Sequence, residues 1–272
     1  MQLGVSSFAF GWAVGVPDHP LPRAMDAFDV IRFAREQGLG LVQFGDHLPL
    51  HTLDNAALAQ LADCAQGGNR PVALEVGARG LTAGHLERYL EVARRLQAKL
   101  LRFVIDRPGY EPEPDAIISL LRNAAPTLEA AGVYLGLENH DRFPAHTLRR
   151  IVEASGTKHI GICLDTANSL GAGEGLAEVL DQLAPLTVNL HLKDFAISRV
   201  DYTMGFVVEG RPAGEGMLDV PALLGRLRRY DRCRTVVLET WTPPETFLPD
   251  TIAKERRWAE ASLAYLKPFF QP

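Results

Sequence analysis

The sequence predicts a single (β/α)₈ barrel that spans residues 1–272. Eight short runs rich in β-branched and aromatic residues alternate with amphipathic helical segments along the chain. This alternation implies right-handed crossovers and a parallel sheet, and eight units in about 270 residues favour closure into a barrel. No Pro/Ser-rich linker or shift in composition divides the chain. The motif GxGxxG is missing after the first run, which disfavours a dinucleotide-binding fold.

The predicted strands are short and mostly apolar, and they cover residues 3–10, 39–46, 72–77, 99–105, 133–140, 160–165, 187–195 and 234–241. Helices predicted between them include residues 24–38, 54–66, 82–97 and 115–132. Several of these helices open on Asp or Thr and close on Gly, as helix caps require. Within residues 82–97, an apolar stripe at helical spacing is made by Leu86, Leu90, Val92, Ala93 and Leu96.

The composition is that of a globular protein, with 47% hydrophobic and 22% charged residues. A net charge of −5 argues against a nucleic-acid partner, which usually requires a concentrated basic surface. No segment approaches the roughly 18 uninterrupted apolar residues of a membrane span. The apolar first 17 residues lack a basic region, so they are expected to form a strand and a loop rather than a signal peptide. Three scattered cysteines without a CxxC motif fit a reduced, cytoplasmic location.

Four consecutive predicted strands end in an ionisable residue. The fifth ends near Glu138, the sixth at Asp165 and the eighth near Glu239, and the seventh carries His191. In a barrel of this kind, the carboxyl ends of the strands form the active face. We therefore expect these four side chains to converge at the mouth of the barrel.

Three buried carboxylates raise one another's pKa, and burial penalises their charged forms, so their convergence predicts a bound cation. Three carboxylates and one imidazole form a mixed oxygen and nitrogen set that suits one Mn²⁺ ion, with Mg²⁺, Co²⁺ or Zn²⁺ as alternatives. Each residue alone is more often an ion-pair or core residue than a ligand. Four of them at one level of the barrel are hard to explain in that way.

The segments ENH, LDTAN, HLKD and LETW resemble the xylose isomerase-like TIM barrel superfamily, and in particular its sugar phosphate isomerase/epimerase group. The resemblance covers the whole chain and includes GRPAGEGMLDVPALL. It implies that Glu138, Asp165, His191 and Glu239 hold the metal and that the two glutamates also move protons. It further implies a homo-oligomer, for which the apolar residues 265–270 are a candidate interface.

The expected substrate is a small keto-sugar or keto-polyol. Loss of a proton beside its carbonyl would give a metal-stabilised enediolate, and return of the proton would complete an isomerisation or epimerisation. A lyase or dehydratase that expels a group from the next carbon is the alternative. One departure favours that alternative: free-ketohexose epimerases have a His three residues after the Asp, whereas this chain has Asn168, which binds hydroxyls but does not titrate.

Other polar residues lie within or just after the predicted strands. Arg102 is expected either to pair with Glu75 inside the barrel or, at the mouth, to bind a substrate carboxylate or phosphate. His140 faces the same side as Glu138 and is a candidate acid/base or hydrogen-bond donor, although a loop role is equally compatible. Lys193 shares a face with His191 and would stabilise an oxyanion or neutralise carboxylates. Asp194 is expected in a turn or as a partner that orients His191.

Residues 196–219 form the longest stretch without helical periodicity and follow the seventh strand, so they predict a lid over the active face. Arg199 and Arg211 in this segment are candidates for binding an anionic substrate. Trp12 and Trp241, just past the first and eighth strands, are candidates for an apolar wall against a sugar, or for simple packing.

Two other functions compete with a sugar-converting enzyme. The superfamily's metal-dependent DNA endonucleases use several additional histidines, whereas only eight occur here and most lie outside the strand ends. A non-catalytic sugar-binding module is the other, and it has little need for two glutamates beside a metal. The sequence therefore predicts an enzyme, with a small sugar-like molecule as its partner.

Overall fold

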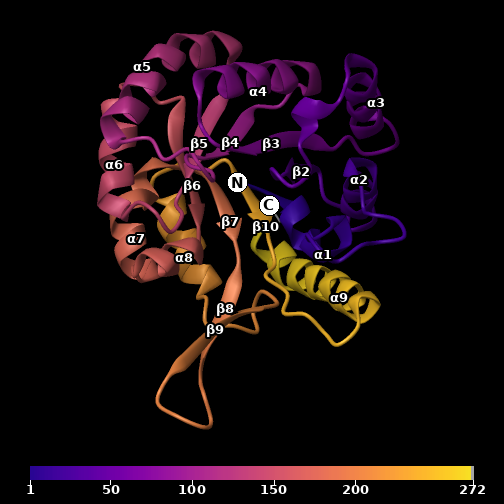
Figure 1. The fold of residues 1–272 in the computed structure, drawn as a ribbon. Helices are drawn as coiled ribbons and strands as arrows, with labels where there is room; N and C mark the ends of the chain where they lie inside the picture. Colours follow the sequence, from indigo (N-terminus) through magenta and orange to yellow (C-terminus); the bar gives the residue numbers. More distant parts are fainter. Residues whose placement is uncertain (271–272) are drawn as a thin grey trace.

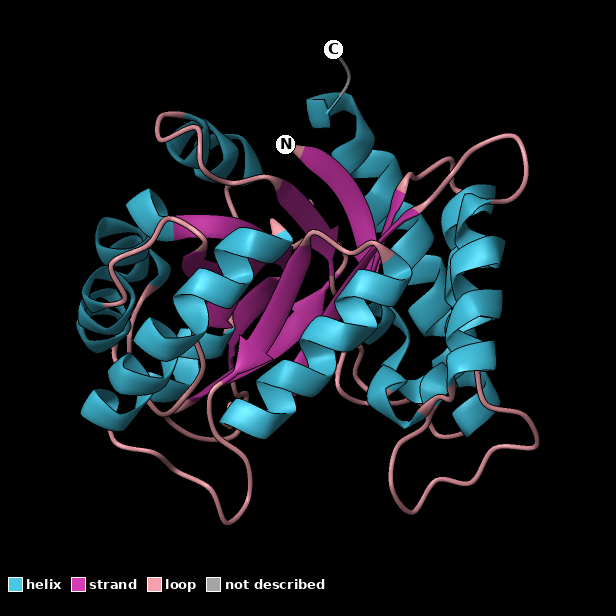
Figure 2. Cartoon of the chain, turned by 90° about the horizontal axis from the view of Figure 1, so that it is seen from above, coloured by secondary structure: helices cyan, strands magenta, loops and turns pink. Residues whose placement is uncertain are grey.

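Eight parallel strands close into a barrel in the computed structural model, which describes residues 1–270, and helices surround the barrel (Figures 1 and 2). Around the barrel the strand order is β1-β10-β7-β6-β5-β4-β3-β2, which is chain order apart from an inserted hairpin, β8–β9. The barrel strands are β1 (Gln2–Ser6), β2 (Leu41–Phe44), β3 (Ala73–Arg79), β4 (Leu100–Val104), β5 (Tyr134–Glu138), β6 (Ile160–Asp165), β7 (Thr187–Leu192) and β10 (Thr235–Leu238). The predicted (β/α)₈ barrel is confirmed.

The α-helices lie outside the strands and alternate with them (Figure 2). They are α1 (Gly11–Val14), α2 (Ala27–Glu36), α3 (Asn55–Gln66), α4 (Ala83–Leu96), α5 (Pro114–Ala131), α6 (Ala145–Ala154), α7 (Leu176–Leu183), α8 (Val220–Arg228) and α9 (Leu248–Leu266). The predicted caps form: the side chains of Asp54 and Thr82 accept hydrogen bonds from the backbone N–H groups of Ala57 and His85. No helix within residues 1–270 combines the length and apolar character that crossing a membrane requires.

The core lies between the strands and the inward faces of the helices. The predicted stripe of α4 is fully buried against the barrel, Leu86 and Leu90 included. Burial of each such leucine contributes roughly 1.5–3 kcal/mol through the hydrophobic effect. Because apolar side chains fill the space between strands and helices, polar side chains can gather at the carboxyl ends of the strands.

Most observed strands are shorter than the apolar runs that predicted them, and two of these runs show why. After β1, Ser7–Phe10 forms a 3₁₀ helix, because the Ser6 hydroxyl accepts the N–H of Phe8 and turns the chain. The seventh run divides at Lys193, where β7 ends and β8 begins. Apolar composition marks buried residues, but it does not distinguish a strand from the turn that follows it.

Residues 196–219 are not an irregular loop. Most of this segment belongs to an antiparallel hairpin, β8 (Asp194–Arg199) and β9 (Phe206–Arg211), which projects away from the barrel (Figure 1). Asp194 secures its base by accepting hydrogen bonds from the backbone N–H groups of Gly214, Gly216 and Leu218. The sequence predicted a lid loop here and not a hairpin, because the partner of each strand is the other strand, which a search for helical periodicity does not reveal.

Candidate metal centre

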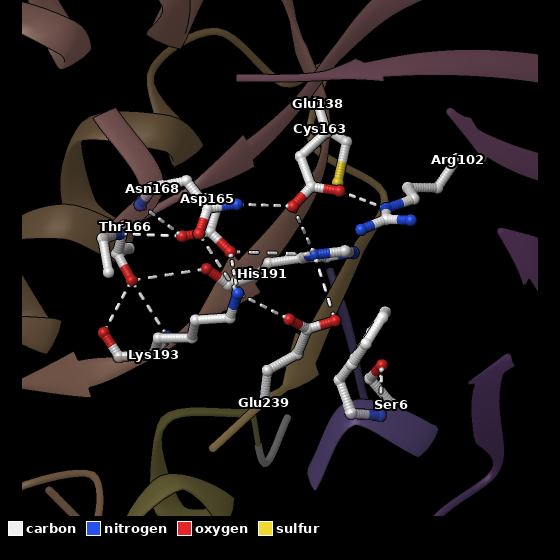
Figure 3. Close-up of polar contacts among 12 residues, drawn as sticks. Ser6, Arg102, Glu138, Cys163, Asp165, Thr166, Asn168, His191, Lys193 and Glu239 are labelled. Carbon is white, nitrogen blue, oxygen red and sulfur yellow. Dashed lines mark hydrogen bonds and ion pairs between the residues drawn. The ribbon is translucent and has the colours of Figure 1, made fainter. Parts of the chain in front are cut away.

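Glu138, Asp165, His191 and Glu239 meet at the carboxyl ends of β5, β6, β7 and β10, and each is almost fully buried (Figure 3). Asp165 and His191 are direct neighbours in the strand register. From His191 Nδ1, the distances are 3.2 Å to Glu239 Oε1, 3.6 Å to Glu138 Oε1 and 3.9 Å to Asp165 Oδ2. The structure therefore brings together all four residues predicted to bind the metal.

Ligand atoms of Asp165, His191 and Glu239 lie within 4.8 Å of one another and form the tighter group. Four buried atoms in it accept no hydrogen bond: His191 Nδ1, Asp165 Oδ2 and both carboxylate oxygens of Glu239. Buried acceptors without a hydrogen bond are costly, and a divalent ion bound among these four atoms would satisfy them. The donor set of two carboxylates and an imidazole suits a divalent ion such as Mn²⁺, Mg²⁺, Co²⁺ or Zn²⁺.

The orientation of His191 is set from inside the barrel by Gln43 of β2. Both N–H groups of the Gln43 amide have acceptors, Glu75 Oε2 at 2.9 Å and Asn189 Oδ1 at 3.1 Å. Its carbonyl oxygen must therefore face His191 Nε2, 2.5 Å away, and accept a hydrogen bond from it. With this proton on Nε2, a neutral His191 would direct the lone pair of Nδ1 toward the carboxylates, as a metal ligand requires.

Asp165 is held by the backbone and by one amide. Its Oδ1 accepts hydrogen bonds from the N–H groups of Ala167 and Asn168, at 2.8 and 2.9 Å. Asn139 bonds the Asp165 backbone twice, donating to its carbonyl oxygen and accepting from its N–H. Only Oδ2 remains directed toward the other candidate ligands.

Two cations neutralise the cluster (Figure 3). Lys193 Nζ lies 2.8 Å from Asp165 Oδ2 and 3.0 Å from Glu239 Oε2, as ion pairs without hydrogen-bond geometry. Arg102 pairs with Glu138 Oε2 and donates a hydrogen bond to Asp46 Oδ1 at 2.8 Å. Burial alone would raise the pKa of Glu138, but Arg102 and His191 outweigh burial and hold that pKa well below its usual range.

The expected pairing of Arg102 with Glu75 was wrong. Both side chains lie on the inner faces of their strands, but Arg102 is opposite Gly77, two residues nearer the mouth of the barrel than Glu75, and its partners there are Glu138 and Asp46. Glu75 instead accepts from Gln43, and burial raises its pKa to about 7. Asp194 likewise contacts the base of the hairpin rather than His191.

Asn168 lies against the cluster. Its amide nitrogen donates to Glu138 Oε1 at 2.8 Å, and its carbonyl oxygen is 3.4 Å from Lys193 Nζ. Glu138 is therefore contacted on both oxygens, by Arg102 on one side and by Asn168 on the other. Cys163, which sequence reasoning missed, sits opposite Glu138 in the register and donates its thiol to Asn189 Oδ1 at 3.0 Å.

A cavity of about 650 Å³ opens above this cluster. Polar groups on its wall include Asn168, Lys193 and His140, and the apolar part of the wall is formed by Phe8, Leu170, Val208 and Trp241. His140 Nε2 lies 3.1 Å from Arg79 Nη2, and its Nδ1 pairs with Asp141. The structure thus brings His140, Asn168, Lys193 and Trp241 to one cavity, and their roles toward a substrate stay predictions.

Three other predicted contact residues lie outside this wall. Trp12 lines a neighbouring cavity of about 450 Å³ that it shares with Trp241, and its indole N–H donates to the carbonyl of Thr242 at 2.9 Å. Arg199 is exposed on the hairpin, where it contacts Met204, and Arg211 pairs with Glu209. The two arginines do not reach the cluster because the hairpin points away from the barrel (Figure 1).

Residues 31–269 match the family model described as xylose isomerase-like TIM barrel. The chain is 32% identical over 266 residues to the 3-oxo-isoapionate decarboxylase of Pectobacterium atrosepticum, covering 98% of this chain and 95% of that protein. Its fold is similar to that of D-psicose 3-epimerase from Clostridium cellulolyticum, with a TM-score of 0.73 at 15% identity over 98% of both chains. It is also similar to a xylose isomerase-like protein from Mycobacterium smegmatis in complex with magnesium, with a TM-score of 0.69 at 14% identity over 97% of both chains.

Proposed function

This chain belongs to the xylose isomerase-like TIM barrel family, and we propose that it is a divalent-metal-dependent enzyme that decarboxylates a 3-oxo sugar acid. The observation that carries the proposal is the state of Glu138, which Arg102 and Asn168 engage on both oxygens. An epimerase needs two carboxylates free to carry a proton, one on each face of a carbon. Decarboxylation needs no carboxylate base, only a single proton donor.

Asp165, His191 and Glu239 would hold the ion, with Glu138 beside them. When bound, the ion would act as a Lewis acid toward the carbonyl and hydroxyl oxygens of the substrate. Gln43 would keep the Nδ1 lone pair of His191 directed at that position.

A 3-oxo acid has a carbonyl two carbons away from its carboxylate. In the proposed reaction the bond between C1 and C2 breaks, CO₂ leaves, and the electron pair forms the enolate of C2 and C3. Lys193 lines the cavity and carries the charge that would stabilise the enolate oxygen. Its ammonium, held charged between Asp165 and Glu239, is also the proton donor that we assign to C2.

The apolar part of the cavity wall supports the same reaction. Phe8, Leu170 and Trp241 border the space above Lys193. A carboxylate in weakly solvating surroundings loses CO₂ more readily, because its charge disperses as the bond breaks. The relative that is 32% identical is named a decarboxylase, which agrees with this assignment.

Isomerisation or epimerisation beside a carbonyl is the second candidate. Glu138 and Glu239 both approach His191 Nδ1, at 3.6 and 3.2 Å, so two carboxylates from different strands border one position. Release of Glu138 from Arg102 on metal binding would free the second base. The enediolate formed by loss of a proton beside the carbonyl could also eliminate water. The assay below distinguishes this third outcome from the other two.

The test is to incubate the Mn²⁺-loaded protein in D₂O with 3-oxo sugar acids labelled with ¹³C at C1, and with keto-sugars and inososes. Release of ¹³CO₂ with one deuterium at C2 supports the proposal. Deuterium exchange with the skeleton retained supports the epimerase, and loss of water supports elimination. The Lys193→Met variant should lose CO₂ release, whereas Lys158→Met, at an exposed position, should keep it. CO₂ release that persists in Lys193→Met would overturn the role of Lys193.

A further inference from the structure

A sulfur atom belongs to a second group of candidate ligands beside the metal centre. One ligand atom from each of Glu138, Cys163 and His191 lies within 4.8 Å of the other two, and all three residues are buried. The group of Asp165, His191 and Glu239 contains only nitrogen and oxygen ligands. The two groups therefore share His191 and differ in the sulfur, to which the proposed function gives no role.

The strand register places the Cys163 thiol on the inner face of the barrel, one level deeper than Asp165. Cys163 precedes Asp165 by two residues on β6, so both side chains point to the same side of the strand. Its direct neighbours in the register are Glu138 on β5 and Asn189 on β7. Figure 3 shows the sulfur beside the Glu138 carboxylate. The thiol thus faces polar groups and not only the apolar core.

The atoms around the thiol are able to bind an ion. Within residues 1–270, His191 Nδ1 and Glu138 Oε2 are buried and make no hydrogen bond. His191 Nε2 is bonded to the amide oxygen of Gln43, so Nδ1 is the nitrogen that an ion would bind. Cys163 donates its thiol to Asn189 Oδ1 at 3.0 Å, and the same oxygen accepts from Gln43 at 3.1 Å. Asn189 Oδ1 therefore keeps a donor when the thiol loses its proton.

The charges of this group also balance those of a divalent ion. As the bond between the ion and Cys163 Sγ forms, the thiol proton passes to bulk water and leaves a thiolate. The thiolate and the Glu138 carboxylate then neutralise the two charges of the ion, so no net charge enters the core. Arg102, which pairs with Glu138 Oε2, also donates to Asp46 Oδ1 at 2.8 Å. The guanidinium therefore keeps a partner when the ion takes Glu138.

Sulfur selects a different class of ion from that selected by carboxylates. Thiolates favour soft ions such as Zn²⁺ and its heavier analogue Cd²⁺, whereas carboxylates favour Mn²⁺ and Mg²⁺. Because His191 Nδ1 belongs to both groups, an ion in one group excludes an ion from the other. The cavity wall contains Asn168 and Lys193 but not Cys163, so an ion bonded to Cys163 would lie deeper and farther from a substrate.

We propose that Glu138, Cys163 and His191 form a second ion position, which binds thiophilic divalent ions such as Zn²⁺ and Cd²⁺. An ion at this position keeps Mn²⁺ from Asp165 and Glu239 by taking His191, and it thereby inhibits the enzyme. The second position stands on the geometry of the three residues alone. Inhibition of decarboxylation also rests on the proposed function, so binding and activity are measured separately.

Titration of Cd²⁺ into the metal-free protein tests the second position, because a bond between cadmium and a thiolate has a charge-transfer absorption in the ultraviolet. We expect this absorption in the wild type and its loss in Cys163→Ser. Cys64→Ser is the matched control and should keep the absorption, since Cys64 is a half-buried free cysteine on α3. A wild type that gains no such absorption, or an absorption that persists in Cys163→Ser, would overturn the proposal.

Competition between the two ions is the second measurement. Cd²⁺ should release Mn²⁺ from the wild type, as seen by the electron paramagnetic resonance signal of free Mn²⁺. Half release from Cys163→Ser should require a Cd²⁺ concentration about tenfold higher or more, because the sulfur ligand is missing. One Mn²⁺ and one Cd²⁺ bound together to each wild-type chain would overturn the exclusion.

The folded state of Cys163→Ser is checked by circular dichroism. A serine hydroxyl can donate the same hydrogen bond to Asn189 Oδ1, so the variant should fold and bind Mn²⁺ like the wild type. Cys163→Ala replaces it in both measurements if the serine variant does not fold.

The activity of the Mn²⁺-loaded protein is measured last, as CO₂ release in the presence of Zn²⁺. Zn²⁺ should inhibit the wild type at a concentration about tenfold lower or less than Cys163→Ser requires. Equal inhibition of both proteins would overturn the inhibitory role of Cys163. Absence of CO₂ release without Zn²⁺ would instead contradict the proposed function, while the cadmium absorption decides the second position by itself.

Discussion

Replacement of Gln43 by Leu tests whether the inside of the barrel controls the metal centre. Gln43 donates to Glu75 and Asn189 and accepts from His191, and Leu has neither donor nor acceptor. The Nε2–H of His191 would lose its acceptor, and its Nδ1 would no longer be held toward the carboxylates. Loss of such a supporting contact typically weakens metal binding 10–100-fold, which is about 1.4–2.7 kcal/mol.

The assay is titration of Mn²⁺ into metal-free protein, followed by calorimetry or by the electron paramagnetic resonance signal of free Mn²⁺. Gln66→Leu, at the exposed end of α3, is the matched control and should bind like the wild type. The folded state of each variant is checked by circular dichroism. A folded Gln43→Leu protein that binds Mn²⁺ within twofold of the wild type would show that Gln43 does not control the metal centre.

Three further predictions follow from the contacts above. Arg102→Leu should lower the stability of the metal-free protein by about 3–5 kcal/mol, because Glu138 loses its buried partner. The same variant should bind Mn²⁺ about tenfold more tightly or better, and weaker binding would contradict this prediction. Gly210→Ala should destabilise the protein by about 1–3 kcal/mol in thermal unfolding, since a Cβ there would meet the carbonyl oxygen of Trp241 at 1.9 Å. The control Gly225→Ala, in open space on α8, should stabilise the protein by about 0.5–1 kcal/mol. Burial raises the pKa of Glu255 from 4.5 to about 7, so the contribution of this carboxyl to stability is fully present below about pH 4.5 and is lost as the pH rises through 7. In urea unfolding, the free energy of unfolding of the wild type should therefore fall by about 3 kcal/mol more between pH 4.5 and pH 8 than that of Glu255→Gln. An equal change in the two proteins would contradict this prediction.

The strand ends were predictable because the signal is local. Glu138, Asp165 and Glu239 each follow an apolar run that only a buried strand explains, and the parallel barrel then places their side chains at one rim. His191 and Lys193 were assigned to one face from a spacing of two residues. These inferences needed the fold class, which the alternation of strands and helices along the chain indicates, and the period of a strand, which can be read in a single segment.

The remaining features depend on residues far apart in the sequence. Gln43 meets His191 across the barrel, 148 positions away, and nothing in either segment indicates the contact. From the sequence, Arg102 was expected to pair with Glu75 or to bind a substrate anion, and only its level in the barrel gives it Glu138 as a partner. The hairpin was missed because its strands are recognised by pairing, not by an apolar face.

The state of Glu138 illustrates the same limit for function. The sequence places Glu138 at the end of a strand, and from this position we expected it to act as a base that moves a proton. Arg102 and Asn168 change this expectation, since each engages one of its oxygens. The choice between decarboxylation and epimerisation therefore depends on neighbours that come from β4 and from the loop after β6.

Asp165, His191 and Glu239 form the group that we propose holds one divalent ion, on which the proposed chemistry depends. The most direct measurement is the metal content of the protein after equilibration with Mn²⁺ and removal of free metal, determined by mass spectrometry with inductively coupled plasma. We expect one ion per chain in the wild type and less than a tenth of an ion in His191→Ala combined with Asp165→Ala. No bound metal in the wild type, or an undiminished ion in the double variant, would contradict it.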